Sequence, residues 1–193
     1  MNYNISKVCQ SIYYHIRNIS RIRDLLDLEC VKLLVNSLVT SRLDYCNSLL
    51  RGTPRFCINR LQLMQNKAAK LITKSKRRDH VTPLLRQLHW LPVEKRIEFK
   101  IACITYKCLN DVSAPNYLKS LIQVYNPPRT LRSSYSFNLN VPFPKTLIYN
   151  RSFAYAAPSI WNSLSIQTKR SNSITSFKKN LKTEYFRQVY NTF

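Results

Sequence analysis

The chain has 193 residues, of which 31 are Lys or Arg and 9 are Asp or Glu, so its formal net charge is +22 at pH 7. Its single glycine, Gly52, excludes both the P-loop and the dinucleotide-binding loop, because each needs several glycines. Hydrophobic residues make up 45% of the chain, which is enough to bury a core and argues against general disorder.

The N-terminal half is predicted to be helical. Over residues 4–26, Ile and Val recur at spacings of three and four residues, as in an amphipathic helix. A second helix is expected from Asp27, its N-cap, to about Leu50, where Gly52-Thr53-Pro54 ends it. A third is expected over residues 55–74, with an apolar stripe on one side and basic residues on another.

Two proline signals then mark helix starts. Thr82-Pro83 predicts Thr82 at the N-cap and Pro83 at the first helical position of a short helix that ends near Leu88. Leu91-Pro92 predicts a helix from residue 93 to about 109. A further short helix is expected over residues 115–123.

The composition changes after residue 126. Residues 127–172 contain five prolines among Ser, Asn and aromatic residues, and alternation over 139–143 and 147–149 indicates two short extended segments, consistent with a β-hairpin. A final helix is predicted over 173–190. The sequence thus predicts a mainly α protein: a helical bundle over 1–126, and a C-terminal extension over 127–193 with an irregular proline-rich segment and a last helix.

Catalytic and metal-binding motifs are not found in the sequence. The six cysteines include no C-x-x-C pair, so we expect free buried thiols rather than zinc ligands. The acids include no Asp-Asp or Asp-x-Asp pair of the kind that holds Mg²⁺, and Glu94 and Glu98 are expected to pair with Lys95 and Arg96. No catalytic residue, metal or cofactor is predicted.

The N-terminus lacks the apolar region of a secretory signal, and no run is long enough to span a bilayer. We therefore expect an intracellular protein, nuclear or cytoplasmic, with reduced cysteines.

Basic residues form several clusters with few acids between them. A solvated face would explain any one cluster, but the set as a whole favours a polyanionic partner, with nucleic acid first and an acidic membrane surface last. The predicted contact residues are Arg60, Lys67, Lys70, Lys74, Lys76, Arg77, Arg78, Arg96, Lys100, Lys107, Arg129 and Arg132. A further basic cluster consists of Lys178, Lys179 and Lys182.

Several motifs, in order along the chain, resemble one family. Residues 41–50, Ser-Arg-Leu-Asp-Tyr-Cys-Asn-Ser-Leu-Leu, are similar to a stretch downstream of the polymerase core in non-LTR (LINE-type) retrotransposon reverse transcriptases of the jockey superfamily. The likeness covers nearly the whole chain. It continues over residues 60–62, 65–69, 79–83, 88–93, 96–100, 129–134, 153–154, 157–164 and 176–178.

The resemblance implies the thumb and C-terminal region of an RNA-directed DNA polymerase, without the endonuclease and without the Tyr-Ala-Asp-Asp-like metal site of the palm. In that family this region is expected to grip template RNA and the growing RNA–DNA duplex. We therefore expect a non-catalytic fragment that binds RNA, RNA–DNA hybrid or DNA regardless of sequence, and that could also contact the missing polymerase domains. Two alternatives remain open: a truncated piece of the active polymerase, and a degenerate element product with no independent role.

Overall fold

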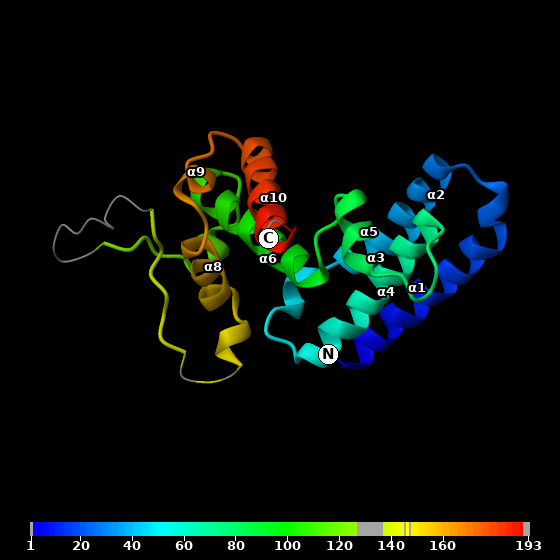
Figure 1. Cartoon of the computed structure of the whole chain (residues 1–193). Helices are drawn as coiled ribbons and strands as arrows, with labels where there is room; N and C mark the ends of the chain where they lie inside the picture. Colours follow the sequence, from blue (N-terminus) through cyan, green and yellow to red (C-terminus); the bar gives the residue numbers. More distant parts are fainter. Residues whose placement is uncertain (1, 127–136, 145, 147, 191–193) are drawn as a thin grey trace. The chain divides into compact units, whose positions relative to one another are not determined.

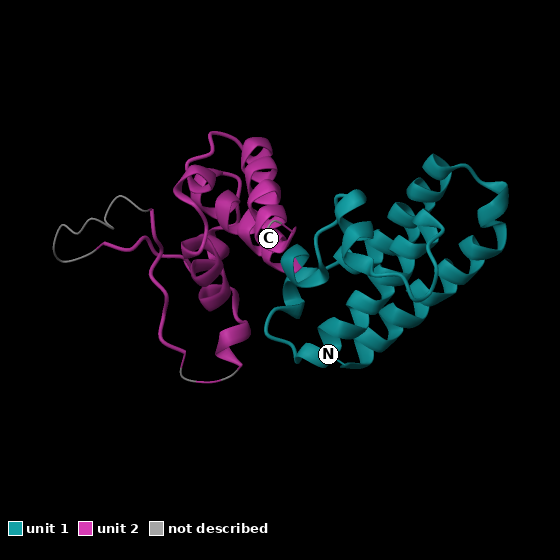
Figure 2. Ribbon diagram, viewed as in Figure 1, with its two compact units in different colours: residues 1–96 teal, residues 97–193 magenta. Residues whose placement is uncertain are grey.

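The computed structural model describes residues 2–126, 137–144, 146 and 148–190 (Figure 1). These residues are mainly helical, which confirms the predicted fold class. The chain forms two compact units, Met1–Arg96 and Ile97–Phe193 (Figure 2). The division falls within a continuous helix, α6 (Val93–Asn110), and the compositional change after residue 126 lies inside the second unit.

The first unit is built around two long helices, α1 and α4, that run side by side in the same direction (Figure 1). Its helices are α1 (Asn2–Ile22), α2 (Leu28–Val35), α3 (Ser41–Asp44), α4 (Arg55–Thr73) and α5 (Val81–Gln87). Between them lie two 3-10 segments, η1 (Arg23–Leu25) and η3 (Asn47–Leu50), and one π turn, η2 (Asn36–Thr40). The isoleucine stripe predicted for the first helix is buried in α1, at Ile5, Ile12, Ile16 and Ile19.

The single long helix expected over residues 27–50 is interrupted. Asp27 caps α2 as predicted, with its carboxylate accepting a hydrogen bond from the Cys30 amide at 3.0 Å. The helix then widens into η2, where the Ser41 hydroxyl bonds back to the Ser37 carbonyl. Short polar side chains compete with the backbone in this way and disturb a regular helix. It ends before Cys46, whose φ of 50° is left-handed.

The two proline signals have different outcomes. The helix α6 begins at Val93, directly after Leu91-Pro92, as predicted. The helix α5 begins at Val81 with His80 at its N-cap, so the prediction of Thr82 as the N-cap is wrong. Pro83 still lies in the first turn, where a missing N–H costs little.

Two glutamines of α4 position the start of α6. The Gln62 side-chain oxygen accepts a hydrogen bond from the Val93 amide at 2.9 Å, which satisfies one of the free amides at that helix N-terminus. The Gln65 side chain is buried and donates to the Leu91 carbonyl at 2.9 Å.

The described residues of the second unit form most of α6 and four further helices. They are α7 (Asn116–Lys119), α8 (Phe153–Asn162), α9 (Ile166–Lys169) and α10 (Ile174–Tyr190), with a 3-10 segment, η5 (Tyr149–Arg151). The helix expected over 115–123 is therefore a single turn, whereas the final helix is confirmed. At the core, the Phe177 ring stacks on Tyr106 and Trp161, with centroid distances of 4.4 and 5.9 Å. The Tyr106 hydroxyl donates to the Ser171 carbonyl at 2.6 Å, so its polar atom is satisfied.

The extended segments form one isolated antiparallel bridge among the described residues, between Val124 and Leu139. The Asn162 side chain holds Leu139 from the other side, accepting from its amide at 2.8 Å and donating to its carbonyl at 2.9 Å. A hairpin between 139–143 and 147–149 is not formed at Tyr149, which lies in η5; Leu147 is outside the described residues.

Candidate nucleic-acid interface

Most acids of the chain bind other groups of the protein. Ion pairs join Asp24 to Lys74 (2.8 Å), Glu29 to Lys32 (2.7 Å) and Asp44 to Arg96. Four others hold caps or turns through their carboxylates, namely Asp27, Asp79, Asp111 and Glu184. Because each unit holds at least three times as many Lys and Arg as Asp and Glu, most cations are left without a carboxylate partner.

Three of the predicted contact residues form a row on α4 that faces α1. Arg60, Lys67 and Lys74 are seven residues apart, which keeps them on one side of the helix. Each contacts a different group of the N-terminal segment: Arg60 with the Asn2 side chain (3.1 Å), Lys67 with the Tyr13 ring (4.8 Å to its centroid) and Lys74 with the Asp24 carboxylate (2.8 Å). These contacts fix the positions of the cations, while Lys67 and Lys74 remain exposed.

The end of α4 leads into a tight turn that presents adjacent cations. Lys74 ends the helix in the left-handed conformation, with φ at 52°, and the Ser75 amide bonds back to the Lys70 carbonyl at 3.1 Å. The Lys70 ammonium donates to the Arg77 carbonyl at 2.6 Å. Lys70 therefore fastens the following turn, which is the role that the structure gives this predicted contact residue.

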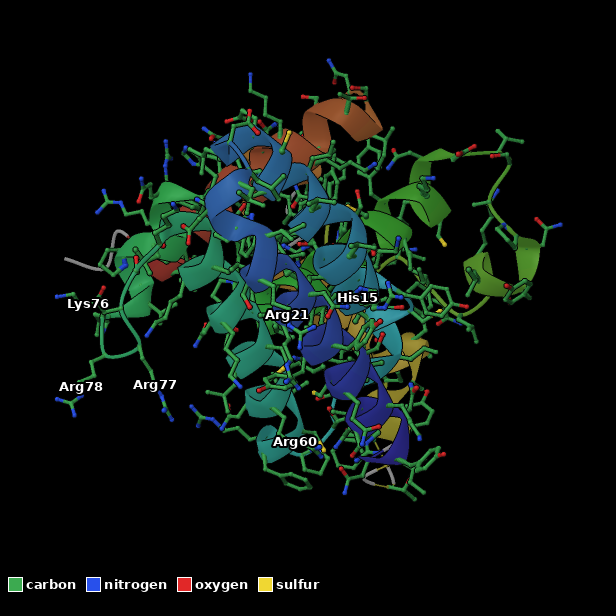
Figure 3. All side chains as sticks on the ribbon, turned by 90° about the vertical axis from the view of Figure 1, so that its right-hand side faces the viewer. His15, Arg21, Arg60, Lys76, Arg77 and Arg78 are labelled. Carbon is green, nitrogen blue, oxygen red and sulfur yellow. The ribbon has the colours of Figure 1, made fainter. Side chains whose placement is uncertain are left out.

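That turn, Lys76–Asp79, is called the basic turn below. Two hydrogen bonds close it: the Asp79 amide donates to the Lys76 carbonyl at 3.1 Å, and the Lys76 amide donates to the Asp79 carboxylate at 2.7 Å. The side chains of Lys76, Arg77 and Arg78 are exposed and project away from the ribbon (Figure 3). None of the three side chains has a partner among the described residues.

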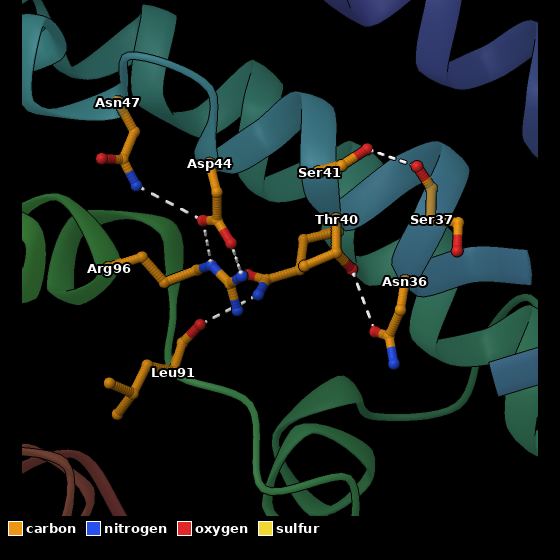
Figure 4. A network of polar contacts seen from close by, with 9 residues as sticks. Asn36, Ser37, Thr40, Ser41, Asp44, Asn47, Leu91 and Arg96 are labelled. Atoms are coloured by element: carbon orange, nitrogen blue, oxygen red, sulfur yellow. Dashed lines mark hydrogen bonds and ion pairs between the residues drawn. The ribbon is translucent and has the colours of Figure 1, made fainter. Parts of the chain in front are cut away.

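Arg96 is held within the first unit. Its guanidinium binds the Asp44 carboxylate through two nitrogens, with Nε at 2.8 Å from Oδ1, and its side chain is 17% exposed (Figure 4). The carboxylate that Arg96 binds here comes from α3, a distant part of the sequence, which the spacing within α6 did not predict. Nucleic-acid binding by Arg96 stays a prediction, and the ion pair with Asp44 argues against it.

In the second unit, Lys100 and Lys107 of α6 and Lys178 of α10 are exposed, and all three are near enough to Cys103 for their charges to act on its thiol. Burial raises the pKa of the Cys103 thiol to about 11, although the three ammonium groups act in the opposite direction. The sequence placed Lys178 in a separate cluster, because only the packing of α10 brings it beside α6. Arg129 and Arg132 lie outside the described residues.

A hollow of about 650 Å³ lies beside the end of α4, and its mostly apolar and neutral lining includes Arg23, Lys32, Lys74 and Trp90. Its cations are already bonded to protein oxygens. Arg23 donates to the carbonyls of Leu71 and Ile72 at 3.0 and 2.9 Å, and Lys32 and Lys74 are the ion-paired residues described above. The hollow therefore offers less free charge than the basic turn.

The cysteines depart from expectation in part. All six are free; Cys9, Cys57, Cys103 and Cys108 are buried, but Cys30 and Cys46 are exposed. Within the described residues no three His, Cys, Asp or Glu side chains gather where they could hold a metal ion. None of the described helices combines the length and apolar character needed to cross a membrane.

Comparison with protein-family models, curated proteins and solved structures finds no match to this chain.

Proposed function

We propose that the chain is a non-catalytic nucleic-acid-binding protein that holds RNA, RNA–DNA hybrid or DNA by the phosphate backbone, regardless of sequence. The observation that carries this proposal is the basic turn. Lys76, Arg77 and Arg78 are three adjacent exposed cations without partners among the described residues, on a turn closed by Asp79 and fastened by Lys70. A protein that binds nucleic acid in this way acts inside the cell, in the nucleus or the cytoplasm.

Phosphate binding accounts for the charge distribution. Cations that replace counterions condensed on a nucleic acid gain affinity from the release of those ions, whatever the base sequence. A fixed turn loses less conformational freedom on binding than a mobile one does. Lys67, exposed on the α4 row, extends the cationic surface along the helix.

The motifs that resemble non-LTR reverse transcriptases support a more specific version of the proposal. In that version the chain is the thumb and C-terminal region of such a polymerase, and its ligand is template RNA or the RNA–DNA duplex. Binding that is tighter for RNA–DNA hybrid than for DNA duplex would support this version, and equal binding would leave only the general one.

The test is a titration of the purified chain with RNA–DNA hybrid, RNA and duplex DNA at several salt concentrations. The variant K76A/R77A/R78A is expected to weaken binding to all three ligands alike. Its logarithmic salt dependence should be shallower by about one for each phosphate that the variant no longer binds.

A charge-matched control removes the same three charges from exposed positions of α10, in the variant K179A/K182A/R187A. We expect this control to lose less affinity than the basic-turn variant. Equal losses of affinity in the two variants would show that binding depends on the net charge of the chain and not on the basic turn. Failure of the unaltered chain to bind any of the three ligands in dilute buffer would overturn the proposal.

A further inference from the structure

The exposed face of α1 carries a stripe of aromatic and cationic side chains. Its members recur at spacings of four and three residues, which keeps them on one side of the helix, opposite the buried isoleucines. The stripe, all of it exposed, consists of Tyr3, Lys7, Gln10, Tyr14, Arg17 and Arg21. No Asp or Glu occurs anywhere in the 21 residues of α1.

The aromatic rings of the stripe are open to solvent. Tyr3 is 75% exposed and Tyr14 is 62% exposed, and the Lys7 ammonium lies 5.5 Å from the Tyr3 ring centroid. The Arg17 and Arg21 side chains have no partner among the described residues, and Arg21 is labelled in Figure 3. The stripe thus combines exposed π faces with unpaired cations.

Single-stranded nucleic acid is the ligand whose chemistry matches this combination. It carries phosphates along one edge and bases whose faces are free to stack on aromatic rings, whereas a duplex hides those faces inside its own stack. Tyr3 and Tyr14 are separated by about 16 Å along the helix axis, at 1.5 Å per residue, so two separate bases of one strand can stack on them.

We infer that α1 binds single-stranded RNA or DNA, with bases stacked on Tyr3 and Tyr14 and phosphates held by Lys7, Arg17 and Arg21. This inference rests on the proposed function. It adds that the ligand of α1 is single-stranded and that α1 provides a second binding surface beside the α4 row and the basic turn. The two surfaces are neighbours, because Tyr13 at the edge of the stripe contacts Lys67 of the α4 row. Nothing in the sequence pattern of basic runs pointed to α1, whose cations are spread along the helix.

The experiment compares binding of oligothymidylate with binding of duplex DNA of the same length, using the full chain. The variant Y3A/Y14A is expected to lower the affinity for oligothymidylate by about 5- to 150-fold for each stacked base and to leave duplex affinity unchanged. Y3F/Y14F retains the rings and is expected to bind as the unaltered chain does. The matched control is Y45A/Y117A, which removes two tyrosines that are 81% and 70% exposed elsewhere.

The outcomes separate this inference from the proposed function. Unchanged oligothymidylate affinity in Y3A/Y14A, an equal loss for duplex, or an equal loss in Y45A/Y117A would each overturn the inference. None of these results bears on the proposed function, which the basic-turn variant tests. If Y3A/Y14A bound anionic lipid vesicles more weakly but kept its affinity for oligothymidylate, the stripe would be assigned to a membrane surface. That result would also overturn the inference. Absence of binding to either nucleic acid by the unaltered chain would reject the proposed function itself.

Discussion

Arg96 at the start of α6 and Asp44 at the end of α3 form a two-pronged ion pair across 52 residues of sequence. Asp44 also accepts a hydrogen bond from the Asn47 side chain at 3.3 Å, so its carboxylate joins three segments of the first unit. This pair holds the motif at residues 41–50 against the beginning of α6.

The Arg96–Asp44 pair is expected to contribute to stability. R96A leaves the half-exposed Asp44 carboxylate without its partner and should lower the free energy of unfolding by about 1.5–3 kcal/mol, the range for hydrogen bonds to charged groups. R96K should lose part of this, because an ammonium cannot bind both oxygens in the same fork. Urea denaturation measures the change in unfolding free energy. If R96A were as stable as the unaltered chain but bound RNA more weakly, Arg96 would instead be assigned to ligand binding.

Arg23 is expected to stabilise the end of α4. Its guanidinium donates to the carbonyls of Leu71 and Ile72, which have no partner within the helix. R23A should therefore cost about 1–3 kcal/mol in thermal or chemical denaturation. The neighbouring R21A, at an exposed position, should stay within about 0.5 kcal/mol of the unaltered chain; equal effects of both variants would contradict this role for Arg23.

Acid should destabilise the first unit through two carboxylates. Hydrogen bonding and the charge of Lys74 hold the pKa of Asp24 below its usual value, and hydrogen bonds from Cys30 do the same for Asp27. A lowered folded-state pKa adds stability above the unfolded-state value of about 3.9, and that stability is lost as the pH falls through the folded-state value. The thermal midpoint should thus fall below about pH 4, and D24N/D27N should show a shallower decline than the unaltered chain. Parallel declines would contradict the assignment.

Alkali should act on the second unit through Cys103. The folded thiol keeps its proton up to a pKa of about 11, whereas the thiol of the unfolded chain ionises near 8.5. Stability contributed by the protonated thiol is present below about pH 8.5 and is lost as the pH rises through the folded-state value. Between about pH 8.5 and pH 11, C103A should therefore lose less stability than the unaltered chain does. The stability of each protein is compared with its own value at pH 7. C46A, at an exposed position, should decline as the unaltered chain does.

The thiols should react in an order set by exposure. Cys46 and Cys30 are exposed, and a hydrogen bond to Asp27 raises the pKa of Cys30, so Cys46 should react first with a disulfide reagent at pH 7 and Cys30 second. The four buried thiols should react only when the chain unfolds. Mass spectrometry of partly labelled protein measures the order, and early labelling of Cys9 or Cys57 would contradict the packing of α1 on α4.

The element pattern was predictable where apolar spacing or a cap signal is local. The isoleucine stripe of α1, the Asp27 cap, the span of α4, the start of α6 at Val93 and the final helix all follow from neighbours within a few residues. The interruption after Val35 was not predictable in this way, since the bond of the Ser41 side chain back to the Ser37 carbonyl competes with the regular helix by a small energy. The one β-bridge among the described residues pairs Leu139 with Val124, a segment that shows no alternation.

The sequence by itself determined the helical class, the excess of positive charge and the cationic residues of the basic turn, because composition and short-range spacing carry that information. Only the tertiary structure decided which cations are free. Arg96 pairs with a carboxylate 52 residues away, Lys178 joins Lys100 and Lys107 through the packing of α10 on α6, and the stripe on α1 becomes a surface because its opposite face is buried. Whether a charge is paired depends on contacts between segments that are distant in the chain, and local spacing does not encode those contacts.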